Sequence, residues 1–299
     1  MPDDEPWTHH EAIVNDVRLH YVAAGPEDGD LVVLLHGFPE FWYSWHEQLP
    51  ALADAGYRVL APDMRGYNRS EKPPGISSYR TSELVGDVVG LIDHAGRESA
   101  HVVGHDWGGA VAWSVAIGVP QVVDRLAILN APHPTAFQRE LTGNFDQLKK
   151  SWYMFFFQLP WLPEFLLTLD DARLLDHFLA GWGTDDGTFT PEDRRRYREA
   201  FARPGAARAS INYSRATIRG MVRSLPGGGV GDQHVDVPTL VCWGELDGAL
   251  GTDLLEGLDE WVADLRVERF PDATHWVQLD EPDAVNAALL EYFGETDSA

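Results

Sequence analysis

The chain has 299 residues and is 44% hydrophobic, enough for one large domain with a full core or for a core with an inserted segment. Its net charge of −24 argues against nucleic acid or an anionic membrane as a partner. No apolar run approaches the ~18 residues of a membrane-spanning helix, and the acidic N-terminus has no apolar signal core, so we expect a globular cytoplasmic protein.

The first part of the chain alternates strand-type apolar runs with helical patterns. The sequence H-G-F-P-E at 36–40 follows the first short apolar run. Thr81 is expected to cap a helix, and Gly96 stands just beyond that helix's end. The expected elements are a strand or hairpin at 13–24, strands at 31–35 and 57–62, and helices at 42–55 and 81–94.

Residues 99–109 join a short apolar strand, ending near Gly104, to a helix of small and apolar residues. Residues 104–108 have the G-x-S-x-G form of a nucleophile elbow, with Asp106 where Ser usually stands. The central residue of an elbow sits in a strained turn, and side chains at the two glycine positions would collide with the strand and the helix. We therefore expect Asp106 to be lifted above the sheet, near the first amides of the helix. The alternative is an ordinary tight turn in which Asp106 caps the helix.

The alternation stops after a strand expected at 124–130. Residues 132–232 are rich in aromatic residues and helical patterns, and T-P-E-D at 190–193 is typical of a helix start. We expect the arginine run at 194–196 to form a solvated face and the glycine-rich stretch 226–231 to be a flexible exit. The later expected elements are strands at 238–243, with Cys242 buried, and 265–270, and helices at 252–262 and 281–293.

Alternation on both sides of a helical block predicts a largely parallel sheet with a helical lid inserted after its sixth strand. In such sheets the active site lies at the carboxyl ends of the strands. The residues that follow expected strands and can meet at that edge are Phe38, Asp106, Asp247 and His275.

The sequence at this point resembles the α/β-hydrolase fold, and within it the soluble epoxide hydrolases, over nearly the whole chain. Residues 36–45, 63–67 and 104–109 are similar to three successive signatures of that group, the first of them its oxyanion segment. The chain order of nucleophile, acid and histidine is that of the fold. The resemblance implies a mostly parallel eight-stranded sheet with helices on both faces and an inserted helical cap. The corresponding segments are a first core part (1–131), a cap (132–232) and a second core part (233–299).

The cap carries the more discriminating part of the resemblance. Residues 153–158 have the Y-x-x-x-F-Q form of the family, whose Tyr is a ring-opening acid, and Asn212-Tyr213 is similar to the second cap tyrosine. The resemblance therefore implies Tyr153 and Tyr213 as ring-opening acids. The alternative is that both tyrosines only pack in an aromatic lid.

The resemblance also implies a triad of Asp106, Asp247 and His275. Some dehalogenases of the fold carry an acid just after the sixth strand, but Asn130 stands near there, which points to Asp247 as the triad acid. Glu245 is the competing acid, and His275 on an ordinary loop is the structural alternative.

The chemistry gives each residue type a reason. A carboxylate, with a reference pKa of about 3.9, is ionised at neutral pH and can attack an sp³ carbon without a base. The product is an alkyl ester on Asp106, which a water activated by His275 hydrolyses, with the amides of Phe38 and Trp107 holding the oxyanion. The leaving oxygen of an epoxide stays attached as an alkoxide, to which a Tyr hydroxyl (reference pKa about 10) can donate a proton. Phe38, Trp107, Phe157 and Trp276 are expected to line the substrate pocket, with His36 and His105 supporting neighbouring turns.

We therefore predict an epoxide hydrolase that converts an epoxide and water to a vicinal diol without a cofactor or a metal. Its partners are the small-molecule substrate and water, with no nucleic acid and no membrane, and a homodimer is one of the assemblies that the sequence allows. Lys occurs only three times against 20 Arg. The acidic, Lys-poor surface fits salt adaptation or simply a GC-rich genome.

Two other functions remain open. A haloalkane dehalogenase uses the same nucleophile and often carries Trp after it, as here. It needs a second halide donor, which Phe38 does not supply, so Trp152, Trp161 or Trp182 would have to serve. The fluoroacetate type of dehalogenase has Arg where Trp107 stands. The remaining alternative is a non-catalytic binding protein of hydrolase fold, which a turnover assay would distinguish.

Overall fold

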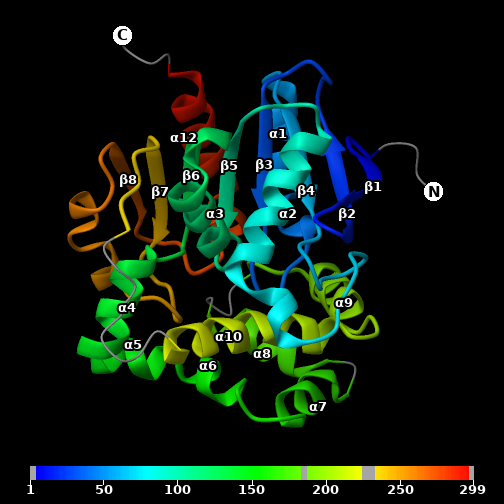
Figure 1. The fold of residues 1–299 in the computed structure, drawn as a ribbon, viewed down its shortest axis with the longest axis vertical. Coiled ribbons are helices and arrows are strands. Elements are labelled where there is room, and N and C mark those ends of the chain that lie inside the picture. The colour runs from blue at the N-terminus through cyan, green and yellow to red at the C-terminus, as the bar shows by residue number, and fades with distance from the viewer. Residues whose placement is uncertain (1–4, 171, 183–186, 224–232, 296–299) are drawn as a thin grey trace.

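A sheet of eight strands forms the centre of the part of the chain that the computed structural model describes, residues 5–170, 172–182, 187–223 and 233–295. The strand order is β1-β2-β4-β3-β5-β6-β7-β8 (Figure 1). The β1–β2 and β2–β4 pairs are antiparallel and the others are parallel, which confirms the predicted mostly parallel sheet. The strands are β1 (Thr8–Val14), β2 (Val17–Ala24), β3 (Leu31–Leu35), β4 (Arg58–Pro62), β5 (Ala100–His105), β6 (Val123–Leu129), β7 (Thr239–Gly244) and β8 (Leu265–Phe270).

The burial of the strands follows from their composition. β3 and β7 are continuous apolar runs, buried throughout, as expected of parallel strands covered on both faces. Cys242 is one of these buried β7 residues. The segment expected at 13–24 is a hairpin that begins earlier, at Thr8, and turns at Asn15 and Asp16, both with positive φ.

Helices cover both faces of the sheet. α2 and α3 pack against each other on one face, and α1 and α12 pack against each other on the opposite face (Figure 1). The core helices are α1 (Gln48–Asp54), α2 (Thr81–His94), α3 (Trp107–Gly118), α11 (Val277–Asp280) and α12 (Pro282–Gly294), with 3₁₀ turns η1 (Trp42–Trp45), η2 (Ile76–Tyr79), η3 (Pro120–Val122), η4 (Thr252–Leu255) and η5 (Leu258–Glu260).

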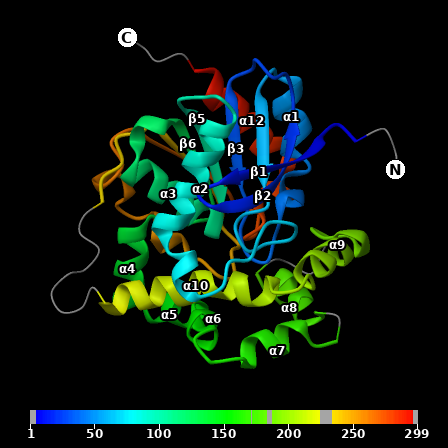
Figure 2. The same cartoon turned by 45° about the vertical axis from the view of Figure 1, so that its right-hand side comes forward.

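The described chain between β6 and β7 contains helices and no strand, as predicted. Figures 1 and 2 both show these cap helices lying across the edge of the sheet at the carboxyl ends of the parallel strands. Thr190 caps α9 through a capping box with Asp193, which confirms the predicted helix start. The cap helices are α4 (Pro134–Gly143), α5 (Phe145–Lys150), α6 (Trp152–Phe156), α7 (Leu162–Thr168), α8 (Leu174–Gly181), α9 (Pro191–Phe201) and α10 (Ala206–Arg223).

Three local predictions were wrong. The helix expected at 42–55 is split into η1 and α1, and the helix expected at 252–262 is the pair of turns η4 and η5. Gly257 separates these two turns in a left-handed conformation that ends helical propagation. Thr81 is the first residue of α2 and not its cap, because Arg80 occupies the cap position without a side-chain bond.

Two further expectations concern features beyond the sheet and its helices. The stretch 226–231 lies outside the described residues. In the described residues, no helix combines the length and apolar character needed to cross a membrane.

Candidate active site

Asp106 sits at the turn between β5 and α3 with φ 50° and ψ −117°, a conformation that non-glycine residues rarely adopt. The glycines on either side make this turn possible. A Cβ at Gly104 would overlap the backbone of Gly108, and a Cβ at Gly108 would overlap the carbonyl of Leu35. The elbow therefore has the strained geometry that the G-x-D-x-G pattern predicts.

A backbone amide holds one oxygen of the Asp106 carboxylate. The Phe38 N–H donates to Oδ1 over 2.7 Å, and the backbone amide of Trp107 also favours the charged form of the carboxylate. Burial raises the pKa of Asp106 above its ordinary value, although His275, His105 and the two amides oppose that effect. The amides expected to form an oxyanion hole thus already contact the carboxylate of the candidate nucleophile.

His275 and Asp247 come from the loops after β8 and β7. Nδ1 of His275 lies 2.7 Å from Oδ2 of Asp247. Nε2 of His275 is buried without a hydrogen-bond partner among the described residues and lies 3.7 Å from Oδ2 of Asp106. Burial disfavours a charged imidazole, but Asp247 and Asp106 outweigh it and raise the pKa of His275 to about 9. The imidazole is thus anchored at one nitrogen and free at the other.

Hydrogen bonds fix both oxygens of the Asp247 carboxylate. Its Oδ1 accepts the amides of Ala249 and Leu250, at 2.7 and 2.8 Å. Its Oδ2 accepts the side-chain amide of Asn130 at 2.8 Å in addition to His275. Burial opposes its charge, but His275 and these hydrogen bonds lower the pKa of Asp247.

The competing acid lies elsewhere, because the Glu245 carboxylate pairs with Arg269, 2.5 Å away. Asn130 follows β6, with φ 39°, and its Oδ1 accepts the amide of Gly244. In the sequence Asn130 was informative only as a missing acid. Its position directly after a strand was the signal that could have revealed its contact with Asp247.

A second buried acid, which the sequence did not single out, supports the site from below. Oε2 of Glu40 accepts the Gly37 amide and lies 2.7 Å from Nδ1 of His105. Nε2 of His105 lies 2.8 Å from the backbone carbonyl of His275. Burial opposes the charge of Glu40, but His105 outweighs it and lowers the pKa of Glu40. His105 therefore supports the loop that carries His275, and Nε2 of His36 accepts the amide of Met64 in the neighbouring turn.

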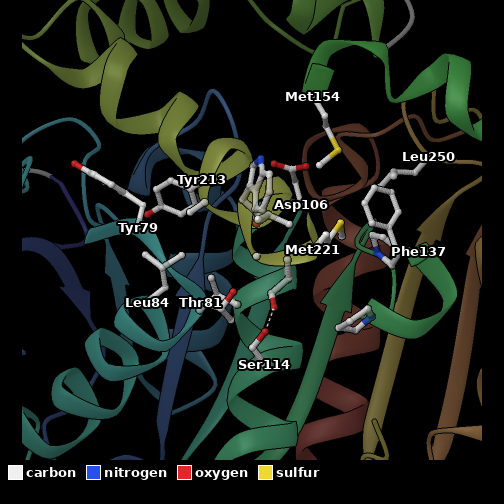
Figure 3. Close-up of a pocket in the computed structure, with 18 of the residues that line it drawn as sticks. Tyr79, Thr81, Leu84, Asp106, Ser114, Phe137, Met154, Tyr213, Met221 and Leu250 are labelled. Atoms are coloured by element: carbon white, nitrogen blue, oxygen red, sulfur yellow. Dashed lines mark hydrogen bonds between the residues drawn. The ribbon is translucent and has the colours of Figure 1, made fainter. Parts of the chain in front are cut away.

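A cavity of about 400 Å³ opens beside Asp106. Figure 3 shows Asp106 at its centre, with Tyr213 on one side and Met154 and Leu250 on the other. Most of the lining is apolar, and Ser114, Thr81, Thr217 and Gln233 add polar groups. The cavity runs along α3, from Asp106 at its first turn to Ser114 two turns further on.

Of the four residues expected to line the pocket, Trp107 does so. The other three differ from the expectation, because they are absent from the described lining. Phe38 and Phe157 pack against each other with ring centroids 5.5 Å apart, and Trp276 packs against His275 at 4.9 Å. These bulky rings fill the buried space around the triad instead of facing the cavity.

Both candidate tyrosines line the cavity, but their hydroxyls differ. The Tyr213 hydroxyl donates to the backbone carbonyl of Arg65 over 2.7 Å. The Tyr153 hydroxyl has no partner among the described residues and is not buried away from solvent. Burial raises the pKa of Tyr153, and Asp106 and Asp247 raise it further. Tyr153 is therefore the tyrosine whose proton is available at Asp106.

Tryptophans supply the other possible donors. Nε1 of Trp107 has no partner among the described residues and is not buried away from solvent, so it is available at the cavity wall. Trp152 and Trp161 are exposed on the surface of the cap. The ring of Trp182 lies 4.9 Å from that of Tyr153 and 5.4 Å from that of His275. Trp182 is thus the only one of these three cap tryptophans that contacts the site.

No group of three or more metal-ligating side chains occurs in the described part of the chain.

Comparisons with known proteins identify chains that are similar to this one. A family model described as "alpha/beta hydrolase fold" matches residues 30–282. The chain is 42% identical over 278 residues to "AB hydrolase superfamily protein YfhM" of Bacillus subtilis, covering 93% of this chain and 95% of that protein. It is 36% identical over 302 residues to "Epoxide hydrolase 4" of Homo sapiens, covering 99% and 81%. A Bacillus megaterium epoxide hydrolase solved with an inhibitor superimposes with a TM-score of 0.88 at 31% identity, covering 96% of this chain and 100% of that one.

Proposed function

Because the chain belongs to the α/β-hydrolase fold family, in its epoxide hydrolase group, we propose that it converts an epoxide and water to a vicinal diol through an ester on Asp106. The observation that carries this proposal is that the two oxygens of Asp106 have different surroundings. Oδ1 accepts the backbone amide of Phe38, whereas Oδ2 lies 3.7 Å from the free nitrogen of His275. We also propose that residues 132–232 act as a cap over the site, between core segments 1–131 and 233–299.

The first step is ring opening. Oδ2 attacks an epoxide carbon, a new C–O bond forms, and the C–O bond to the ring oxygen breaks. Oδ1 then becomes the carbonyl oxygen of the ester and stays on the amide of Phe38, and the Trp107 amide also favours negative charge on this carboxyl group. The largely apolar cavity suits a neutral, apolar epoxide.

The ring oxygen leaves as an alkoxide and takes the proton of Tyr153. Its raised pKa keeps the Tyr153 hydroxyl protonated until the alkoxide forms. Nε1 of Trp107, which also lines the cavity and has no partner among the described residues, donates a second hydrogen bond to that oxygen without giving up its proton. In the resting site His275 is protonated, and this proton restores Tyr153, so the ester state contains a neutral imidazole and no net charge is created.

The second step is hydrolysis of the ester. Esterification removes the charge of Asp106, one of the two carboxylates that raise the pKa of His275, so the pKa of His275 falls. The neutral imidazole, oriented by Asp247, takes a proton from water, and the hydroxide attacks the ester carbonyl carbon. The negative charge develops on Oδ1, which the Phe38 amide already holds. When the tetrahedral intermediate collapses, the bond between the carboxyl carbon and Oδ2 breaks. The hydroxyl that water added passes its proton to the departing alkoxide, and the diol is released. Asp106 and protonated His275 are then restored.

The test is a parallel assay of diol formation and halide release on a small panel of aryl and alkyl epoxides and haloalkanes. The proposal expects diol from the epoxides and no diol from the Asp106→Ala variant. Halide release without diol formation would favour haloalkane dehalogenation, for which Trp107 lies at the cavity wall and Trp182 is the cap tryptophan that contacts the site. A folded protein that binds the panel without turnover would favour a non-catalytic binding protein.

A further inference from the structure

The cap carries an unusual concentration of exposed apolar side chains. Ten large hydrophobic residues are exposed in the described chain, and seven of them fall within residues 145–169. Soluble monomers expose such residues singly, and a cluster of this kind marks an interaction site. We call the following seven residues the cap patch: Phe145, Trp152, Phe155, Leu159, Trp161, Phe165 and Leu169.

The cap patch lies on the outside of the molecule, remote from the sheet. Its residues belong to α5, α6, α7 and the segments that follow α6 and α7. Figures 1 and 2 both show these helices in a row along the side of the cap that faces away from the sheet. The cap patch is therefore separate from the cavity at Asp106.

The segment is held in place from the inside. Arg215 of α10 is buried, and its guanidinium donates to the carbonyls of Phe157 and Leu159, at 2.8 and 2.6 Å. It also pairs with the Glu164 carboxylate at 2.6 Å. These contacts fix the loop between α6 and α7, so the apolar side chains outside it are pre-formed.

Trp161 is the most prominent residue of the cap patch. It is 69% exposed and has φ 54°, a left-handed conformation that a large side chain rarely adopts. Prolines stand at 160 and 163, on either side of it. The chain thus maintains a strained backbone at a residue whose ring contacts solvent.

The cap differs from the rest of the protein in its net charge. Residues 132–232 contain 13 Lys and Arg against 12 Asp and Glu, so the net charge of −24 lies entirely on the other two segments. Near the cap patch, Lys149 pairs with Asp146 at 3.3 Å and Arg173 with Asp170 at 3.1 Å. Two copies of the chain repel each other through their cores but not through their caps.

We propose that the cap patch is a self-association surface, on which two copies dock cap to cap with their acidic cores pointing apart. Five of its residues are aromatic and each is at least half exposed, so together they present on the order of 500 Å². A stable interface needs about 800 Å² from each partner, so the aromatic residues would form most of its apolar centre. In a two-fold assembly each cap-patch residue is present at the interface twice, once from each copy.

The test measures mass in solution by sedimentation, from about 1 to about 100 µM protein, at low and high salt. Wild type is expected to dimerise, and more tightly as NaCl rises from about 0.1 M to about 1 M, because salt screens the repulsion between the cores. Trp161→Glu should weaken the dimer by at least about 100-fold, since two new charges meet at the interface. The matched control is Ile13→Glu on β1, which adds the same charge at a 79% exposed residue outside the cap patch and should leave the dimer intact.

Circular dichroism and melting curves show whether each variant is folded, and Phe165→Glu replaces Trp161→Glu if the latter is not. A wild-type chain that stays monomeric in high salt would overturn the proposal, as would a Trp161→Glu dimer as tight as that of the control. A monomer that instead binds phosphatidylcholine vesicles through Trp161 would assign the cap patch to lipid rather than to a second copy.

Discussion

Nε2 of His275 lies 3.7 Å from Oδ2 of Asp106, too far for a hydrogen bond but close enough for each group to control the charge of the other. The carboxylates of Asp247 and Asp106 overcome the effect of burial and raise the pKa of His275 to about 9. Conversely, His275 opposes the upward shift that burial imposes on the pKa of Asp106. The nucleophile and the base of the proposed reaction are therefore coupled in the resting enzyme.

This coupling predicts how stability depends on pH. The pKa of His275 is about 9 in the folded state against the ordinary histidine value of 6.5, so its contribution to stability is fully present below about pH 6.5 and is lost as pH rises towards about 9. As the pH is raised from 6.5 to 9, the melting temperature of wild type should therefore fall relative to that of His275→Gln. His10→Gln, at an exposed position on β1, is the control for loss of an imidazole. A difference that stays constant or moves the other way would contradict the coupling.

The two cap tyrosines should differ in their effect on ring opening. Tyr153→Phe removes the free hydroxyl at the cavity and should slow ester formation about 10²–10³-fold in single-turnover measurements. Tyr213→Phe removes a hydroxyl already bound to the Arg65 carbonyl, so we expect a loss of less than about 10-fold. Equal, large losses in the two variants would restore the two-tyrosine mechanism that the sequence suggested.

Asn130 should act through Asp247. Asn130→Gly keeps the left-handed backbone but deletes the hydrogen bond to Oδ2 of Asp247, a bond to a charged group worth about 1.5–3 kcal/mol. We expect hydrolysis of the ester to slow about 10–100-fold, while ester formation changes much less, as rapid-quench measurement of both steps would show. A variant that slows the two steps equally would indicate general disruption of the site.

The acidic charge predicts a salt effect on stability. The Debye length shortens from about 10 Å at 0.1 M to about 3 Å at 1 M salt, which weakens self-repulsion in a chain of charge −24. The melting temperature should rise over this range of NaCl, with most of the gain early, and salt adaptation would also preserve activity at 1 M. A flat or falling melting temperature would reject the repulsion argument and leave the scarcity of Lys to genome composition.

Much of the fold could be predicted because its signals are local. Buried parallel strands such as β3 are continuous apolar runs, and the Thr190 capping box marks the start of α9 within four residues. The helix expected at 252–262 was wrong because an apolar pattern does not reveal a left-handed residue such as Gly257. The elbow at Asp106 was recognisable because two glycines are a steric requirement of that turn.

The site was less predictable wherever it depends on contacts between distant segments. Glu40 contacts His105 across 65 residues, and Asn130 contacts Asp247 across 117. The hydroxyl of Tyr213 reaches Arg65 across 148 residues, which no pattern in the cap could indicate. Short-range motifs identify the type of chemistry, whereas the hydrogen bonds that decide a residue's role depend on packing.

The most direct measurement is mass spectrometry of the His275→Gln variant mixed with an epoxide that wild type converts. Ring opening needs Asp106 and the proton of Tyr153, whereas hydrolysis needs His275 as the base. In the variant solvent, rather than His275, restores the proton of Tyr153, so a single turnover should leave one substrate molecule per chain as an ester on the peptide that contains Asp106. The double variant Asp106→Ala/His275→Gln should carry no adduct. A folded His275→Gln variant that binds the epoxide but leaves Asp106 unmodified, or that carries the adduct on another residue, would contradict the proposed mechanism.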